Sequence, residues 1–369
     1  MAALFEPLTI GQITFANRAW LAPMCQYSVV ERDGMPNDWH LVHLGAFAQG
    51  GFGLVITEAT AITPIGRITP NDIGIWSDDH VPALRRIVDF VHARTLPTVN
   101  GRIPVRIGVQ LAHAGRKGSN HRGFLSEPRG PMSIGDGGWQ TVSASDLPFD
   151  GYPAPVALDR AGIDAVVDDF VAGAKRAQAA GFDVVEIHAA HGYLLHQFLS
   201  PLSNNRTDEY GGSFTNRVRL VRRVTAAVRR VWHGPLFVRI SATDWVRKGW
   251  SGNDSAALAA LLKFDGADLI DVSSGGNLPT EIPLRPGYQV PFAQHIRASA
   301  QIPTSAVGLI SDPELAEQIL TSGQADAIMV GRAALREPHW PQRAAHALGV
   351  PTDRAPYVPQ HVRGAWPVI

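Results

Sequence analysis

The chain has 369 residues, of which 45% are hydrophobic and 18% charged, a composition that supports a large buried core and excludes a disordered chain. The 33 lysines and arginines balance the 33 aspartates and glutamates, and no basic run is long enough to form a nucleic-acid or anionic-membrane surface. The single cysteine, Cys25, excludes a disulfide framework and a cysteine-ligated iron–sulfur cluster within one chain.

The start of the chain, MAALFEPLTIGQ, bears on cellular location. It has an acidic residue and a proline where a secretory signal peptide needs a basic end and an apolar run. No stretch approaches the roughly 20 apolar residues needed to cross a bilayer. We therefore expect a cytoplasmic protein that binds neither membranes nor nucleic acids.

Short apolar runs alternate with segments of helical spacing along the chain. The clearest predicted helices are 160–180, with Asp159 as N-cap and Gly181 as its C-terminal stop, and 214–231. Eight runs are typical of buried strands: 19–24, 53–59, 105–111, 183–189, 236–241, 269–274, 302–308 and 327–331.

Eight strands that alternate with helices predict an α/β fold, a parallel sheet closed into a (β/α)8 barrel, in a single domain over residues 1–369. A doubly wound open sheet is the alternative, but no Gly-rich turn follows an early strand. The irregular segment 124–159 follows the third predicted strand. We expect this long loop to cover the C-terminal mouth of the barrel as a lid.

Alternation within the strands predicts which side chains enter the barrel. The apolar phase should face the surrounding helices, so the polar phase, with Glu186, Arg239 and Asp271, should point inward. Charges in a low-dielectric interior must neutralise each other or meet a polar group that enters from the mouth. A purely structural ion network remains an alternative for these three residues.

The active site of a barrel enzyme lies at the C-terminal ends of its strands. Glycines follow the seventh and eighth predicted strands, where backbone amides and Arg332 suit a phosphate group. The stretch HAAHGYL, 188–194, follows the fourth. Its histidines have too few neighbouring ligands for an evident zinc site, because such sites need three or four. Metal ligation and a structural histidine pair remain alternatives.

Several of these strand ends, with their sequence contexts, resemble the Old Yellow Enzyme family of FMN-containing ene-reductases. The stretch PMCQY and the short C-terminal tail resemble its thermophilic-like bacterial subclass, which includes xenobiotic reductases. The motifs are APMCQY (22–27), QLAHAGRK (110–117), EIHAAHGYLLHQFLSPLSNNRTDEYGGS (186–213), VRIS (238–241), DVSSGG (271–276), AVGLI (306–310) and VGRAALREP (330–338).

The resemblance implies that a hairpin at 8–18 closes the bottom of the barrel and that FMN binds at the mouth. The flavin phosphate would lie at Gly308, Gly331 and Arg332, and Arg239 would lie near the pyrimidine end of the ring, favouring the reduced anion. The complete set of implied cofactor-binding residues is Ala22, Pro23, Met24, Cys25, Ala59, Gln110, His188, Arg239, Gly308, Gly331 and Arg332.

The resemblance also implies a two-step reaction, in which NADPH or NADH reduces FMN and an α,β-unsaturated carbonyl compound is then reduced. His188 and His191 would bind the carbonyl oxygen, and Tyr193 would protonate the α-carbon. Tyr27 and Cys25 would contact the substrate. The alternatives are a merely packed Tyr193, an inert buried Cys25, a metal-dependent barrel enzyme and a non-catalytic flavin-binding protein.

Two segments depart from the family pattern. The segment 93–111 is longer than the family usually needs, and we expect the barrel bottom to tolerate it. The C-terminal tail extends a few residues further, and it contains Arg363. By resemblance the protein forms a homodimer or homotetramer in which Arg363 reaches a neighbouring active site and contacts substrate.

Overall fold

The computed structural model describes residues 2–367 and shows a closed barrel of eight parallel strands, which confirms the predicted fold. Strands follow one another around the barrel in chain order, and the last pairs with the first. The strands are β3 (Ala19–Leu21), β4 (Leu54–Ala61), β7 (Arg106–Ala112), β10 (Val184–Ala189), β11 (Leu236–Ser241), β12 (Leu269–Ser273), β13 (Thr304–Ala306) and β14 (Ala327–Val330).

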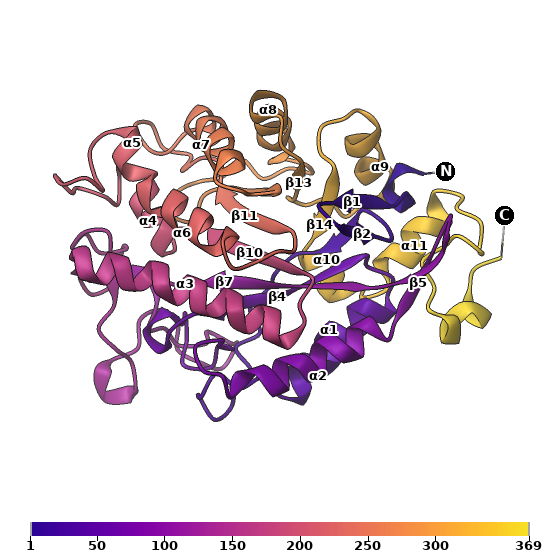
Figure 1. Ribbon diagram of the computed structural model, residues 1–369, viewed down its shortest axis with the longest axis horizontal. Coiled ribbons are helices and arrows are strands. Elements are labelled where there is room, and N and C mark those ends of the chain that lie inside the picture. Colours follow the sequence, from indigo (N-terminus) through magenta and orange to yellow (C-terminus); the bar gives the residue numbers. More distant parts are fainter. Residues whose placement is uncertain (1, 368–369) are drawn as a thin grey trace.

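Helices surround this barrel, with α1, α2 and α3 along one side and α7 and α8 along the opposite side (Figure 1). The helices are α1 (Asp38–Gln49), α2 (His80–His92), α3 (Arg160–Ala180), α4 (Leu194–Leu199), α5 (Phe214–Arg217), α6 (Arg219–Arg229), α7 (Gly252–Phe264), α8 (Val290–Ala300), α9 (Pro313–Thr321), α10 (Arg332–Arg336) and α11 (Trp340–Ala347).

Helix α3 has the predicted bounds because both of its ends carry strong signals. The Asp159 carboxylate accepts a hydrogen bond from the Gly162 N–H, and Gly181 takes the left-handed conformation at φ 91°. The predicted helix 214–231 is instead divided at Val218 and ends at Arg229. At this end, the Arg229 guanidinium donates a hydrogen bond to the carbonyl of Gly234, in the following loop, at 2.8 Å.

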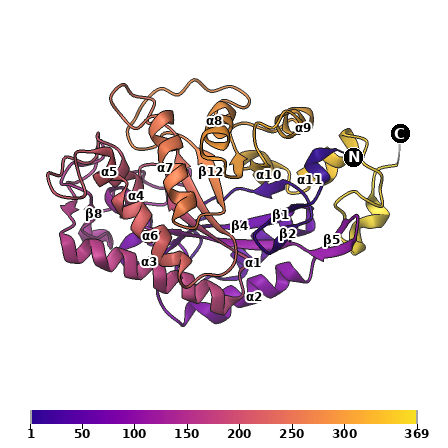
Figure 2. The same cartoon turned by 45° about the horizontal axis from the view of Figure 1, so that its top comes forward.

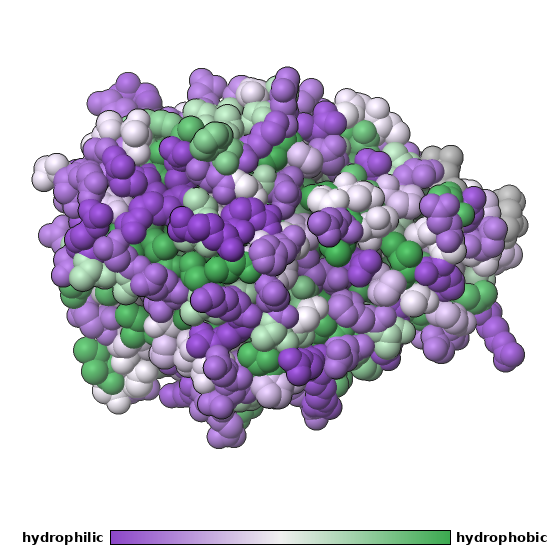
Figure 3. All heavy atoms as spheres, in the orientation of Figure 1, coloured by the Kyte–Doolittle hydropathy of each residue, from purple (hydrophilic) through white to green (hydrophobic). Residues whose placement is uncertain are grey.

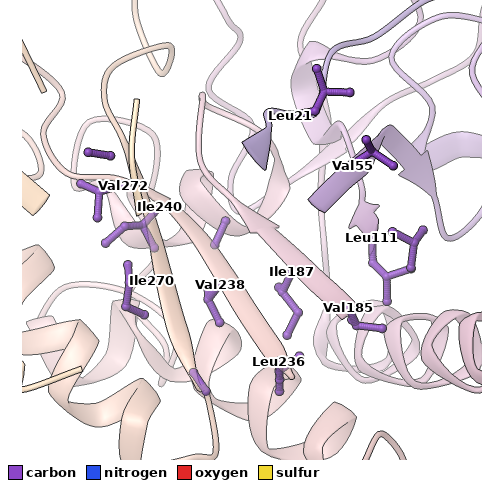
Figure 4. Close-up of a cluster of buried hydrophobic side chains, with 14 of the residues drawn as sticks. Leu21, Val55, Leu111, Val185, Ile187, Leu236, Val238, Ile240, Ile270 and Val272 are labelled. Atoms are coloured by element: carbon purple, nitrogen blue, oxygen red, sulfur yellow. The ribbon is translucent and has the colours of Figure 1, made fainter. Parts of the chain in front are cut away.

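Side chains of the apolar strand phase form the layer between the barrel and its helices, as predicted. Ile187, Val238 and Ile270 are fully buried in one cluster with helix residues such as Phe170 and Val224. Figure 4 shows part of this layer along neighbouring strands. The opposite phase therefore points into the barrel.

The hairpin of β1 (Leu8–Ile10) and β2 (Ile13–Phe15) closes the bottom of the barrel. Phe15 is fully buried, and its ring lies 4.8 Å from that of Trp20 and 6.4 Å from that of Phe237. Val184 and Leu269 complete this inner apolar layer. The hairpin plugs the barrel because its aromatic side chain fills the space between the strand starts.

The longer segment before β7 forms a second hairpin, β5 (Thr95–Thr98) and β6 (Gly101–Pro104). Figures 1 and 2 show β5 beside the C-terminal part of the chain. Arg102 joins the two, because its guanidinium donates to the Tyr357 carbonyl at 2.6 Å. The insertion thus supports the segment that leads to the C-terminal tail.

The long segment 124–159 contains only a short 3-10 turn and two strands of two residues, β8 (Val142–Ser143) and β9 (Val156–Ala157). The Trp139 ring lies over the Arg67 guanidinium at 5.1 Å, and its indole N–H donates to the Ile65 carbonyl at 3.0 Å. These contacts fix the segment to the loop after β4, at the C-terminal side of the barrel.

The described residues include no helix with the length and apolar character needed to cross a membrane. Figure 3 shows that hydrophilic residues prevail on the face in view, with apolar residues in small separate groups.

Candidate active site

A cavity of about 370 Å³ lies at the C-terminal ends of five neighbouring strands, β11, β12, β13, β14 and β3. His191, Ser273 and Arg336 line it together with seven predicted cofactor-binding residues. These seven are Ala22, Pro23, Met24, Arg239, Gly308, Gly331 and Arg332. The other four predicted cofactor-binding residues, Cys25, Ala59, Gln110 and His188, lie outside this lining.

Several hydrogen-bond donors lie close together where the cavity borders the loop after β13 and the start of α10. Gly308 has φ 128° and Leu309 has φ 54°, in the region that favours glycine. Within residues 2–367, the backbone N–H groups of Gly308, Leu309 and Gly331 have no hydrogen-bond acceptor. Arg332 and Arg336, one turn apart on α10, add two guanidinium groups. Unpaired amides beside two cations fit a phosphate group.

Beneath the cavity, the three predicted inward charges meet inside the barrel. Arg239 Nε lies 3.0 Å from Asp271 Oδ2, and the Gln110 amide donates to Glu186 Oε1 at 2.7 Å. Burial, reinforced by Asp271, raises the pKa of Glu186 to about 8, although Arg239 opposes the shift. Burial raises the pKa of Asp271 as well, but Arg239 and the Ser305 hydroxyl oppose that rise. The direct pairing with Arg239 makes Asp271 the carboxylate that balances this charge, and Glu186 is the protonated acid at neutral pH. Ser305 donates a hydrogen bond to Asp271 Oδ1 at 2.8 Å.

His188 and His191 bring one ring nitrogen each to a common point. His191 Nδ1 lies 3.5 Å from His188 Nε2, and the other nitrogens have partners of their own. His188 Nδ1 faces the Ala190 N–H at 3.3 Å, and His191 Nε2 lies 2.7 Å from the Ser273 hydroxyl. Burial, then the charge of Arg239, lowers the pKa of both imidazoles well below the ordinary value. Both rings are neutral at pH 7.

Tyr193 lies beside the histidines in a small cluster with Cys25, Tyr27 and Ala59. Its ring centroid is 5.1 Å from that of His188. Burial, with a contribution from the neighbouring Cys25, raises the pKa of Tyr193 well above its ordinary value. Burial, followed by Glu58, likewise raises the pKa of the Cys25 thiol. Tyr193 and Cys25 therefore keep their protons at neutral pH.

Two basic residues that the sequence reading did not single out hold this region together. Lys117 donates to the carbonyls of His191 at 2.8 Å and Gly276 at 2.7 Å, and its ammonium group lies 5.2 Å from the Tyr193 ring centroid. Arg116 donates to the carbonyls of Leu147 and Asn277 at 2.9 Å each. These partners belong to loops far apart in sequence, so no local signal revealed the roles of Arg116 and Lys117.

Arg336 and Gln289 are further residues that the sequence reading missed. Arg336 follows Arg332 by four positions, and this helical spacing was the available signal. Gln289 lines the cavity and joins two loops, because its side chain accepts from Ser274 Oγ at 2.5 Å and donates to the Val307 carbonyl at 3.0 Å. Its sequence context, PGYQV, carries no comparable signal.

The predicted Arg363 lies on the exposed surface in the last 3-10 turn (Pro359–Gly364) and does not line the cavity of its own chain. No group of three His, Cys, Asp or Glu side chains in the described part of the chain is arranged to hold a metal ion. His188 and His191 thus have no third ligand of these types there.

The residues present fit FMN. The unpaired amides and two arginines would hold the phosphate, and the buried Arg239 would face the ring system as a fixed cation. A Cβ added to Gly331 would meet Met24 Sδ at 3.8 Å and Ala22 Cβ at 4.0 Å, so the backbone borders open space at this point. The cavity therefore combines an anion site with a second region that is lined by the Arg239 guanidinium, whose charge Asp271 balances.

The chain matches the model of the NADH:flavin oxidoreductase / NADH oxidase family over residues 3–350. It is 47% identical over 348 residues to an NADPH dehydrogenase of Geobacillus thermodenitrificans, covering 94% of this chain and 95% of the relative. It is 44% identical over 367 residues to an NADPH dehydrogenase of Listeria innocua, covering 99% and 100%. A structure of morphinone reductase in complex with tetrahydroNAD superposes with a TM-score of 0.74 at 29% identity, covering 94% of this chain and 91% of that chain.

Barrel, cavity and relatives together define an enzyme, an NAD(P)H-dependent flavin oxidoreductase of the NADPH dehydrogenase class. The chain belongs to the NADH:flavin oxidoreductase / NADH oxidase family, the Old Yellow Enzyme family that its motifs resemble.

Proposed function

We propose that this enzyme is an ene-reductase of the thermophilic-like subclass, which reduces the C=C bond of α,β-unsaturated carbonyl compounds with NADPH or NADH. The convergence of His188 Nε2 and His191 Nδ1, 3.5 Å apart, carries the proposal. His188 Nδ1 accepts from the Ala190 N–H, so its proton sits on Nε2. His191 Nε2 lies 2.7 Å from the Ser273 hydroxyl, and we assign the serine as donor in this pair, which places the proton of His191 on Nδ1.

In these assigned tautomers, two neutral N–H donors face the same point. A carbonyl oxygen placed there receives two hydrogen bonds, and these strengthen as negative charge develops on the oxygen. The lowered pKa values of both histidines support this role, because the rings act as neutral donors and do not add charge to the reduced state. FMN, when bound, supplies the hydride that it takes from NAD(P)H.

Tyr193 supplies the proton in this proposal. Its phenol keeps its proton at neutral pH and lies beside His188, so it can donate to the α-carbon of a substrate bound at the histidines. Cys25 and Tyr27 pack beside Tyr193 and would contact the substrate. A merely flavin-binding protein would need no proton donor at this position.

The spectrum of the purified protein tests the overall reaction. We expect a yellow protein that NADPH bleaches without oxygen and that cyclohexenone restores to yellow. A colourless protein, or a bleached protein that cyclohexenone does not reoxidise, would refute the proposal.

Replacing Tyr193 by phenylalanine tests the proton donor. We expect cyclohexenone reduction to slow about 10²-fold or more, while reduction of the flavin by NADPH stays nearly unchanged, since general acid catalysis contributes about 10²–10⁴-fold. Stopped-flow absorbance measures both steps. Tyr210→Phe is the control, because Tyr210 is a buried tyrosine whose hydroxyl bonds to Arg223 outside the cavity. Equal slowing of both steps in Tyr193→Phe would remove Tyr193 as donor.

We also propose that the enzyme is a homodimer or homotetramer in which Arg363 enters a neighbouring active site. Its exposed position away from its own cavity is compatible with that arrangement. The cytoplasmic location expected from the sequence stays a prediction.

A further inference from the structure

The turn at residues 190–193 carries two of the groups that bind and protonate substrate, and it has an unusual backbone. His191 has φ 57° and Gly192 has φ 72°, two successive residues in the left-handed region. Residues other than glycine rarely adopt this backbone conformation, so contacts with the surrounding structure must hold His191 in it. A Cβ on Gly192 would meet the Gly276 carbonyl oxygen at 2.2 Å, so the turn also packs directly against a neighbouring loop.

A buried histidine–carboxylate pair lies on the inner side of this turn. His196 Nδ1 accepts a hydrogen bond from the Gly192 N–H at 2.9 Å, and His196 Nε2 lies 3.1 Å from Asp244 Oδ1. Both side chains have an exposed fraction of 0%. Asp244 Oδ2 accepts from the Ser200 hydroxyl at 2.5 Å and from the Trp250 N–H at 2.8 Å.

These partners determine the protonation of the pair. Because the Gly192 N–H is a donor, Nδ1 of His196 must present its lone pair, and its single proton sits on Nε2, facing Asp244. Burial raises the pKa of Asp244, but the adjacent His196, followed by the hydrogen bonds from Ser200 and the Trp250 N–H, outweighs burial and leaves that pKa below its ordinary value. The carboxylate is thus ionised and accepts every bond that reaches it.

We propose that His196 and Asp244 are positioning residues that hold the Gly192 amide and thereby aim His191 and Tyr193 at the substrate. This inference rests on the substrate site proposed above. Neither residue lines the cavity, so the pair acts through the turn and not through substrate contact. A displacement of about 1 Å at reacting groups can cost about 10²-fold in rate, so support of this kind matters to the reaction.

Asp244→Asn is the decisive variant. An asparagine of the same shape must turn its NH2 group either toward the Trp250 N–H and Ser200 or toward His196. In the second orientation His196 loses its partner for Nε2–H and shifts its proton to Nδ1, against the Gly192 N–H. Either orientation sets donor against donor, so the turn loses its support.

His196→Leu and His196→Asn separate the hydrogen bond from packing. Leucine has no acceptor for the Gly192 N–H. Asparagine places an oxygen at the same number of bonds from the backbone as Nδ1, so it can keep that one bond. Asp183→Asn is the matched control, because Asp183 Oδ2 accepts from His92 Nε2 at 2.7 Å at the opposite end of β10.

Two measurements on the FMN-loaded enzyme test the pair. Flavin absorbance titrated with p-hydroxybenzaldehyde, whose phenolate oxygen mimics the substrate oxygen, reports the histidine site. Hydrogen exchange of the segment 188–195 reports the turn. We expect Asp244→Asn and His196→Leu to weaken binding at least tenfold and speed exchange, His196→Asn to bind within about threefold of the unchanged enzyme, and Asp183→Asn to change neither.

The proposal would be overturned if Asp244→Asn and His196→Leu both showed the same ligand affinity and the same exchange rates as the control Asp183→Asn. If Asp244→Asn does not fold, His196→Leu and His196→Asn decide in the same way. If the unchanged enzyme binds no p-hydroxybenzaldehyde, the proposed function fails at that step, and exchange alone judges the pair. Faster exchange in Asp244→Asn than in Asp183→Asn would then still support it, and equal exchange would refute it.

Discussion

At the scale of single residues, the barrel interior buries one arginine and two carboxylic acids, of which one acid is protonated. Arg239 can balance only one of the two carboxylates near it, and Asp271 takes that place at 3.0 Å. Glu186 keeps its proton because burial and the charge of Asp271 oppose its ionisation, and Gln110 donates to its carbonyl oxygen. Asp271 thereby balances the charge of Arg239 inside the barrel, and the protonated Glu186 adds no unpaired anion beneath the cavity.

The protonated state of Glu186 predicts a pH dependence of stability. The folded-state pKa of about 8 lies above the ordinary value of 4.5, so the unfolded chain releases this proton first as pH rises. The contribution of Glu186 to stability is complete below about pH 4.5, falls with rising pH and is lost as pH passes about 8. Glu186→Gln copies the neutral acid and has no proton to lose.

Urea unfolding at pH 5 and pH 8 checks this prediction. We expect the free energy of unfolding of the unchanged enzyme to fall relative to Glu186→Gln between these pH values. Asp146→Asn, an exposed carboxylate, serves as control and should give no such difference. An identical pH dependence in the unchanged enzyme and Glu186→Gln would show that Glu186 is ionised in the folded state.

At the scale of elements, the hairpin of β1 and β2 is part of the core, although it stands outside the barrel sheet. Phe15→Ala removes a fully buried ring from contact with Trp20 and Phe237, and we expect a loss of about 3–5 kcal/mol in the free energy of unfolding. Urea unfolding measures it. Thr9→Ala on the exposed side of the same hairpin should stay within about 0.5 kcal/mol. A loss of less than about 1 kcal/mol in the free energy of unfolding of Phe15→Ala would contradict this role of the hairpin in the core.

The segment 124–159 yields a second prediction at this scale. Trp139→Ala removes the cation–π contact with Arg67 and the bond to the Ile65 carbonyl. Each contact stabilises by about 1 kcal/mol, so their joint loss of about 2 kcal/mol should accelerate tryptic cleavage after Arg129 about 30-fold. Timed digestion with mass spectrometry measures it. Ile134→Ala, at an exposed side chain of the same segment, is the control, and equal rates in the two variants would refute this anchor.

At the scale of the whole molecule, Arg363 tests whether one active site depends on a second chain. The residue is exposed, and no hydrogen bond or ion pair of its side chain is found within residues 2–367. We expect Arg363→Ala to weaken p-hydroxybenzaldehyde binding about tenfold without altering the flavin content. Sedimentation velocity establishes the oligomeric state, and absorbance titration the affinity. Arg230→Ala at an exposed helix end is the control. Unchanged affinity would exclude the cross-subunit role.

Much of the fold was predictable because its signals are local. Helix α3 has its predicted bounds, since a capping aspartate and a left-handed glycine mark its ends. Strand β11 also has the predicted range 236–241, whereas the predicted 302–308 shortens to Thr304–Ala306. Pairing with neighbours decides where a strand ends, and an apolar run does not show that pairing.

The sequence predicted most of the residues that form the candidate site, but not how they contact one another. Most residues at the strand ends do gather at the mouth, because parallel strands bring their C-terminal ends to one side. Lys117 and the support of the 190–193 turn by Asp244 were not predicted, since both depend on contacts between distant loops. Arg336 was missed although its helical spacing from Arg332 was a local signal. The functional roles of the site residues stay predictions until the variants above are measured.

The amino-acid sequence by itself determined the alternation of strands and helices, the inward phase that carries Glu186, Arg239 and Asp271, and the family motifs. These properties follow from local patterns that do not depend on distant partners. Only the tertiary structure decided which carboxylate pairs with Arg239, which nitrogens of His188 and His191 converge, and what holds their turn. Protonation and hydrogen-bond direction depend on burial and on through-space neighbours, and these exist only after the barrel has closed.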